Sequence, residues 1–205
     1  MTTYTPRLEL KPSNLIGISD EQIAQHWALY EGYVTQSNAL KAELEKLRAE
    51  GQGATAAYVD RRRRFGFEMA GMVLHEYYFG NLKAGVDAAQ AAQFQAAAAK
   101  TFGSFANWQA DFANTGKSRG IGWAVCAIDP QTGDLNNFFI QLHEENNIPG
   151  YHPIVVMDVW EHAYMVDQKA TGRPAYIDEF MKNINWLVVE QRYTAAVANQ
   201  SSKRF

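Results

Sequence analysis

The sequence predicts an α+β protein in which an antiparallel hairpin of two long helices precedes shorter helices and a small three-stranded antiparallel sheet. Two observations predict this order. Helical apolar periodicity dominates the first part of the chain, whereas short apolar and partly β-branched runs begin only after Gly120. The boundary is expected near Ala84 to Asp87, so that residues 1–84 form a helical hairpin domain and residues 85–205 form an α/β domain.

The two long helices have clear start and stop signals. A Ser-Asp-Glu-Gln sequence predicts a capping box in which Ser19 caps the first helix and the Gln22 side chain reaches back to it. The helical pattern continues to Arg48, and a Gly-Gln-Gly sequence then breaks it. A second long helical pattern from about Ala54 to Phe79 predicts the returning arm of the hairpin.

The remaining elements are predicted to be shorter. Strong helix formers follow Asp87, and β-branched residues with turn chemistry follow Gly120. These patterns predict two short helices separated near Gly103, a β-hairpin of residues 121–128 and 135–142, a third strand at 153–157, and a helix over 176–198 interrupted at Asn183 and Asn185.

Composition narrows the class of function. The chain has 205 residues, a formal net charge of -3 and a single cysteine, Cys126, which excludes an intramolecular disulfide. No apolar run approaches the roughly 20 residues of a membrane span, and no global basic excess suggests nucleic acid. The first residues lack the apolar core of a signal peptide. We therefore expect a cytoplasmic protein with a small-molecule partner and no membrane or nucleic-acid partner.

Two of the five histidines fall in the predicted hairpin helices, at His26 and His75. A lone histidine among apolar neighbours is more often a hydrogen-bonded core residue than a ligand. Antiparallel helices, however, can each present one histidine across their shared face, which is how helical bundles build metal sites. The pair therefore makes a metal site a reasonable hypothesis.

The strongest local signal follows the predicted third strand. Asp158 stands at the strand end and His162 lies four residues later. With the two helical histidines, this set offers three imidazoles and one carboxylate, which suits iron, manganese or zinc, whereas a structural zinc site would favour cysteine ligands. A di-iron carboxylate bundle is disfavoured because no glutamate has a histidine three residues later.

Several segments resemble one known family. The sequence DVWEHAY at 158–164 resembles the signature of the iron/manganese superoxide dismutases, in which its Asp and His are metal ligands. The similarity extends from about Ile16 to Trp186 and includes these further segments: HEYYFGNL at 75–82, GIGW at 120–123, RPAY at 173–176 and NINW at 183–186.

The resemblance implies an oxidoreductase that disproportionates superoxide to oxygen and hydrogen peroxide at one iron or manganese ion per subunit. It implies that the four metal ligands are His26, His75, Asp158 and His162. The ligand set does not distinguish iron from manganese, and iron is the metal we expect. A homodimer or homotetramer is also implied.

The first helix departs from the family pattern. Tyr33 resembles the family's gateway tyrosine, but its spacing from His26 is one residue shorter than usual. Both residues would still share one face of a regular α-helix, at i and i+7. The family's second histidine in this helix is replaced by Leu29 or Tyr30, so the family's usual hydrogen-bond chain to Tyr164 is not implied here. These departures motivate an alternative, a metal-binding structural homologue without dismutase turnover.

A second departure concerns the side chain that holds the metal-bound solvent. Gly71 stands where the family's iron branch has a glutamine, whereas His143 stands where archaeal-type members have a histidine. The resemblance thus implies that Tyr33 and His143 are the catalytic groups that supply a proton.

The resemblance also implies roles for residues that surround the ligands or lie at a subunit interface. Trp123 and Trp160 are expected to line the pocket, and Glu161 to bond across a dimer interface to the partner subunit's His162. The basic run from Arg61 to Arg64 is interpreted as a solvated helix face, with substrate attraction as the alternative. His152 has no expected catalytic role.

Overall fold

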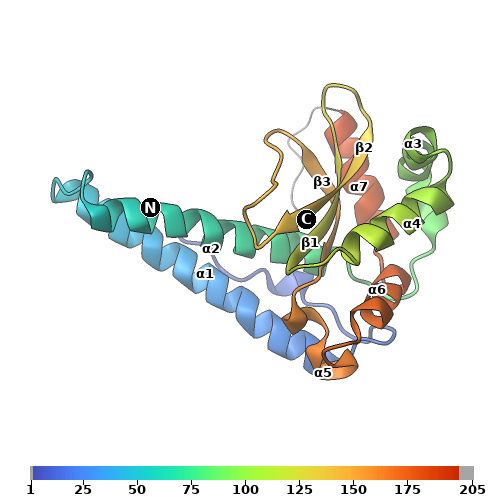
Figure 1. The fold of residues 1–205 in the computed structure, drawn as a ribbon, viewed down its shortest axis with the longest axis horizontal. Helices are drawn as coiled ribbons and strands as arrows, with labels where there is room; N and C mark the ends of the chain where they lie inside the picture. The colour runs from blue at the N-terminus through green and yellow to red at the C-terminus, as the bar shows by residue number, and fades with distance from the viewer. Residues whose placement is uncertain (1, 199–205) are drawn as a thin grey trace.

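The computed structural model describes residues 2–198 and has the predicted α+β architecture (Figure 1). Its elements in chain order are η1 (Leu8–Leu10), α1 (Asp20–Ala49), α2 (Ala56–Gly80), η2 (Ala88–Ala91), α3 (Ala92–Phe102), α4 (Phe105–Gly116), β1 (Gly122–Ile128), β2 (Leu135–Gln141), β3 (His152–Asp158), η3 (Glu161–Ala163), α5 (Met165–Gln168), α6 (Arg173–Lys182) and α7 (Trp186–Val197). The predicted helical hairpin, β-hairpin and third strand are all present.

Helices α1 and α2 form an antiparallel hairpin whose distal end projects away from the rest of the molecule (Figure 1). Ser19 caps α1 as predicted, because its hydroxyl accepts a hydrogen bond from the Gln22 backbone N–H at 3.0 Å. The prediction that the Gln22 side chain bonds back to Ser19 was wrong. The Gln22 side chain instead donates to the His162 carbonyl at 2.6 Å and accepts from the Val166 N–H at 2.9 Å.

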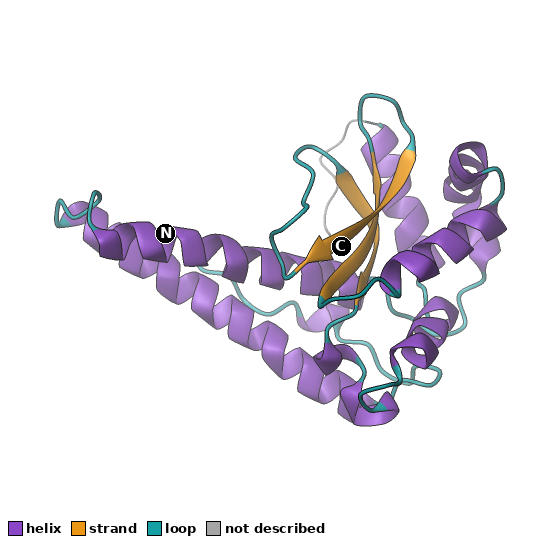
Figure 2. Cartoon of the chain, in the orientation of Figure 1, coloured by secondary structure: helices purple, strands orange, loops and turns teal. Residues whose placement is uncertain are grey.

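The three strands form an antiparallel sheet of order β2-β1-β3 (Figure 2). The central strand β1 is buried along its whole length, as its uninterrupted apolar sequence requires. Helix α4 packs against β1 and β2, whereas α2 and α7 pack against β3. The sheet therefore lies between the last turns of the hairpin and the shorter helices.

Glycine and asparagine separate the shorter helices where the sequence predicted. Gly103 ends α3 with φ of 83°, a left-handed conformation that glycine adopts without the steric penalty of a Cβ. Asn183 and Asn185 lie between α6 and α7. None of the helices formed by residues 2–198 is both long enough and apolar enough to cross a lipid bilayer.

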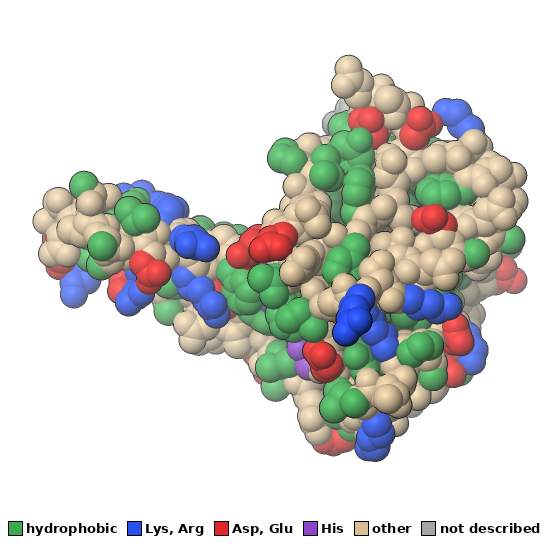
Figure 3. Space-filling model, viewed as in Figure 1, with side chains coloured by type: hydrophobic (Ala, Val, Ile, Leu, Met, Phe, Trp, Pro, Cys, Tyr) green, Lys and Arg blue, Asp and Glu red, His purple; other side chains and the backbone are tan. Residues whose placement is uncertain are grey.

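Basic side chains gather on the projecting arm in the space-filling view (Figure 3). Arg61 and Arg64 in α2 are both paired with carboxylates, those of Glu43 and Glu68 respectively. Two of the four arginines of the basic run therefore have carboxylate partners within the hairpin.

Candidate metal centre

Four side chains from the two halves of the chain meet where the hairpin joins the sheet. His26 comes from α1, His75 from α2, Asp158 from the end of β3 and His162 from η3. One possible ligand atom from each lies within 4.8 Å of the others. Asp158 Oδ2 is central, at 3.0 Å from His26 Nε2, 3.1 Å from His162 Nε2 and 3.7 Å from His75 Nε2.

These separations fit a single bound cation. Ligand atoms at about 2.1 Å from one ion lie roughly 3 to 4 Å apart, as the atoms around Asp158 Oδ2 do. His75 Nε2 is buried without a hydrogen-bond partner among the described residues, and such an orphaned acceptor is costly unless something binds it. Three imidazoles and one carboxylate suit iron or manganese.

The orientation of His75 is set by its own helix. Its Nδ1–H donates to the Gly71 carbonyl one turn earlier, at 2.7 Å. This bond leaves the Nε2 lone pair directed at the centre, as is usual for histidine ligands. On the other side of the centre, Asp158 Oδ1 accepts from the Trp160 N–H at 2.8 Å, which leaves Oδ2 facing the histidines.

Burial and neighbouring charges favour the metal-binding protonation states of His26, His75 and Asp158. Burial lowers the pKa of His26, and burial together with the neighbouring charge of His26 holds the pKa of His75 well below its usual value. Burial raises the pKa of Asp158, but the charge of His162 and hydrogen bonds from His162 and His26 outweigh it and leave that pKa lowered. Neutral imidazoles and an ionised carboxylate are the forms that bind a cation.

A tyrosine–histidine pair lies beside this cluster. Tyr33 Oη lies 2.7 Å from His143 Nε2, and Trp123 Nε1–H donates to His143 Nδ1 at 3.1 Å. Because Nδ1 accepts a hydrogen bond, the neutral imidazole has its proton on Nε2 and donates it to Tyr33 Oη. The Tyr33 ring also contacts the His75 ring, with centroids 5.1 Å apart.

Gly71 shows why no side chain from α2 holds this position. A Cβ at Gly71 would lie 2.7 Å from Tyr33 Cδ1 and 2.8 Å from Cε1, so the tyrosine ring occupies the space that a glutamine would need. His143, which approaches from the loop after β2, therefore faces Tyr33 without competition from α2.

Aromatic rings enclose the cluster. Trp160 stacks on His143 and His162, with ring centroids 5.0 and 5.6 Å apart, and Trp123 meets His75 edge-on at 5.0 Å. Trp123 is fully buried. Trp123 and Trp160 therefore lie directly against His75, His143 and His162.

The structure adds positioning residues that the sequence did not reveal. Gln22 ties α1 to the loop that contains His162, and the Tyr176 hydroxyl donates to the Asp158 carbonyl at 2.8 Å. Leu142, directly before His143, has φ of 54° and accepts a hydrogen bond from Trp160 Nε1 at 3.3 Å. The RPAY resemblance singled out Tyr176 and the capping-box pattern singled out Gln22 in a different role, whereas no sequence signal distinguishes Leu142.

Comparison with known proteins identifies the family of this chain. Residues 90–192 match the family described as iron/manganese superoxide dismutases, C-terminal domain. The iron superoxide dismutase of Aquifex aeolicus is 36% identical over 200 residues, which cover 94% of this chain and 92% of the relative. This chain belongs to the iron/manganese superoxide dismutases.

Other relatives of this dismutase differ in their metal. A manganese/iron enzyme of Aeropyrum pernix is 32% identical over 85% of this chain and 81% of its own. A manganese enzyme of Halobacterium salinarum is 30% identical over 92% of this chain and 90% of its own. Membership of the family is therefore compatible with either metal.

The short spacing between His26 and Tyr33 is accommodated within a regular α-helix. Helix α1 is α-helical from Asp20 to Ala49, and His26 and Tyr33 both reach the site from one face. The buried Tyr30 hydroxyl accepts from the Arg7 N–H at 3.0 Å and donates to Glu76 at 3.2 Å, whereas Leu29 is exposed. Leu29 and Tyr30 are the two candidates for the position of the family's second histidine. Of these two residues, Tyr30 makes buried hydrogen bonds, whereas the Leu29 side chain is exposed.

Proposed function

We propose that this enzyme disproportionates superoxide, with His26, His75, Asp158 and His162 as metal ligands and with Tyr33 and His143 as its catalytic groups. The convergence of three imidazole nitrogens on one oxygen of a buried carboxylate is the observation that supports this most. Two superoxide ions and two protons yield one oxygen molecule and one hydrogen peroxide molecule.

An iron or manganese ion held by these four residues would supply one-electron redox chemistry. The protein must supply protons at a fixed place and limit the access of water. The surrounding tryptophan rings serve the second requirement.

The Tyr33–His143 pair serves the first requirement. Burial raises the pKa of Tyr33 above its ordinary value, and burial lowers the pKa of His143 to about 4. Both groups are therefore neutral at pH 7. Because His143 Nε2–H donates to Tyr33 Oη, the Tyr33 hydroxyl proton remains available for a substrate oxygen, and His143 can replace it from the solvent side.

A non-catalytic homologue that retains metal binding is the alternative function. The shortened His26–Tyr33 spacing and the missing second histidine, at Leu29 or Tyr30, favour this alternative, whereas the Tyr33–His143 contact favours turnover. Superoxide removal by the apo, iron-loaded and manganese-loaded protein, with metal content measured on the same samples, separates them. Turnover by either metallated form supports the dismutase, and bound metal without turnover supports the alternative.

We propose iron as the metal, because the relative at 36% identity is an iron enzyme, whereas the manganese/iron and manganese enzymes named above are 32% and 30% identical. The same assay tests this choice. A higher rate per bound ion with iron than with manganese supports it, whereas the reverse order would assign manganese.

The proposal extends to a homodimer or homotetramer in the cytoplasm. Glu161 is exposed, and the side chain of His162 is 21% exposed, whereas those of the other three ligands are fully buried. An exposed carboxylate beside a partly exposed ligand is the arrangement that an interface across this edge needs. The single buried thiol of Cys126 is compatible with a reducing compartment.

A further inference from the structure

The Gln22 amide makes two hydrogen bonds to the segment that contains the ligand His162. Gln22 Nε2–H donates to the His162 carbonyl at 2.6 Å, and Gln22 Oε1 accepts from the Val166 N–H at 2.9 Å. A backbone carbonyl can only accept and a backbone N–H can only donate, so these two partners fix the orientation of the amide. A side chain of α1 therefore holds two points of a segment that begins 140 residues later.

The two backbone groups that Gln22 joins are those that a continuous α-helix would bond directly. His162 and Val166 are four residues apart, and in an α-helix the N–H of residue i donates to the carbonyl of residue i−4. Here the segment is divided into the 3-10 helix η3 and the single turn α5, with Tyr164 between them at φ of −144°. The Gln22 amide therefore occupies the place of the direct bond and keeps η3 separate from α5.

His162 is the metal ligand that its own element holds least firmly. His26 and His75 lie inside long helices, whereas His162 lies in a 3-10 helix of three residues, and such short helices have few internal bonds. Neither η3 nor α5 has a side-chain cap of its own. The His162 side chain is also the one ligand of the four that is partly exposed. Its position thus depends on contacts from outside its segment.

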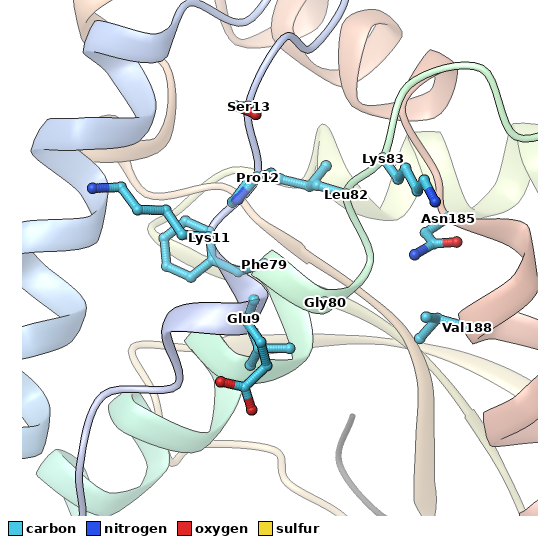
Figure 4. A pocket seen from close by; sticks show the side chains of 11 residues that line it. Glu9, Lys11, Pro12, Ser13, Phe79, Gly80, Leu82, Lys83, Asn185 and Val188 are labelled. Carbon is cyan, nitrogen blue, oxygen red and sulfur yellow. The ribbon is translucent and has the colours of Figure 1, made fainter.

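The contact between Gln22 and this segment is sealed from solvent. Gln22 is 1% exposed, so water does not compete for its two hydrogen bonds, and a buried bond is stronger than one at the surface. The cavity of about 430 Å³ beside Lys83 is a separate feature, because Gln22, His162 and Val166 are not among the residues that line it (Figure 4). Gln22 therefore acts within the protein interior rather than in a ligand pocket.

We propose that Gln22 is a positioning residue that fixes the ligand His162 and thereby sets how firmly the site retains its ion. With the amide in place, His162 Nε2 lies 3.1 Å from Asp158 Oδ2. Without it, the His162 carbonyl and the Val166 N–H lose their partners, and closing the gap to bond them directly moves the His162 backbone. Removal of a group that orients a metal ligand typically weakens metal binding about 10- to 100-fold. The inference rests on the proposed metal site.

Gln22→Met tests this role, because methionine has a similar length and shape but lacks the N–H donors and the carbonyl. Release of iron or manganese from the loaded protein into excess EDTA should be about 10- to 100-fold faster than in the parent. The EPR spectrum of the bound Fe(III) or Mn(II), which depends on the symmetry of the ligand field, should also change. Gln22→Asn keeps an amide but is about 1.5 Å shorter, too short to reach both partners, and should release metal at an intermediate rate.

Two controls separate ligand positioning from general destabilisation. Gln25→Met makes the same exchange at an exposed position of α1, where the amide donates to Glu21. Ser104→Ala removes the side-chain cap of α4 and should lower the unfolding free energy without a change in the segment of His162. Both controls should keep the parental rate of metal release and the parental EPR spectrum.

Three outcomes would overturn the inference. The first is parental metal release and parental spectra in both Gln22 variants. The second is equally accelerated release in Ser104→Ala, which would assign the effect to general stability. The third, uptake of neither iron nor manganese by the parent, would overturn the proposed metal site and this inference with it.

Discussion

Replacing Gly71 by alanine should impair turnover while leaving the metal site assembled. The added Cβ would lie 2.7 Å from Tyr33 Cδ1, whereas non-bonded carbons pack at about 3.5 Å. The ring must therefore move by roughly 0.8 Å. A displacement of that size away from His143 would stretch the Tyr33–His143 bond, now 2.7 Å, beyond the normal hydrogen-bond range.

The expected loss follows from this displacement. A misplacement approaching 1 Å costs up to about 100-fold in rate, so we expect a decrease of about 10- to 100-fold per bound metal ion. Stability should change less. Alanine gains about 1 kcal/mol over glycine inside a helix, and overpacking costs about 1 to 3 kcal/mol, so the net destabilisation is about 0 to 2 kcal/mol.

The assay is superoxide removal normalised to measured metal content, accompanied by urea unfolding. Gly66→Ala is the matched control, because Gly66 lies in the same helix and a Cβ there would meet nothing within 4 Å. It should gain about 1 kcal/mol in unfolding free energy and keep its rate. A normal rate per metal ion in Gly71→Ala would refute the argument that the position of the Tyr33 ring supports proton supply.

Four further predictions concern the loop after β2 and the exposed edge of the site. His143→Ala should retain metal but lose about 100-fold or more in superoxide removal, and an unchanged rate with both metals would remove His143 from the mechanism. Burial lowers the pKa of His143 to about 4 from an ordinary 6.5, so its neutral form stabilises the fold fully above pH 6.5, and this contribution is lost as the pH falls toward 4. Between pH 6.5 and 4, the free energy of unfolding of metal-free His143→Gln should therefore fall by up to about 3 kcal/mol less than that of the metal-free parent. Urea unfolding across this pH range measures the difference, and parallel pH profiles of the two proteins would contradict it. Because Leu142 has φ of 54°, Leu142→Val should destabilise by about 1 to 2 kcal/mol and slow turnover, whereas Leu142→Asn should tolerate the conformation in both assays. Glu161→Ala should weaken the oligomer in sedimentation while Glu145→Ala, another exposed carboxylate, should not, and identical sedimentation of both variants would exclude the interface role.

Most of the architecture was predictable because its signals are local. Apolar periodicity, the Ser19 cap and the Gly103 break depend on neighbouring residues, and each occurs where the sequence indicates. The ligand set was accessible for a related reason. The spacing of Asp158 and His162 is local, and an antiparallel hairpin brings two helical histidines to a shared face.

Contacts between distant side chains were not predictable in this way. Gln22 shows the limit: the residue types at its position satisfy a capping box, yet the side chain bonds with a loop 140 residues later. Only packing against that loop offers the competing carbonyl and N–H groups.

The sequence by itself determined which metal ligands this chain offers and the order in which its elements supply them, because ligand chemistry and local periodicity reside in the residue types. Only the tertiary structure decided that Gly71 leaves room for the Tyr33 ring, that Trp123 selects the tautomer of His143, and that a cavity forms beside Lys83. These features depend on interatomic distances of a few ångströms between segments far apart in the chain, which no local pattern specifies.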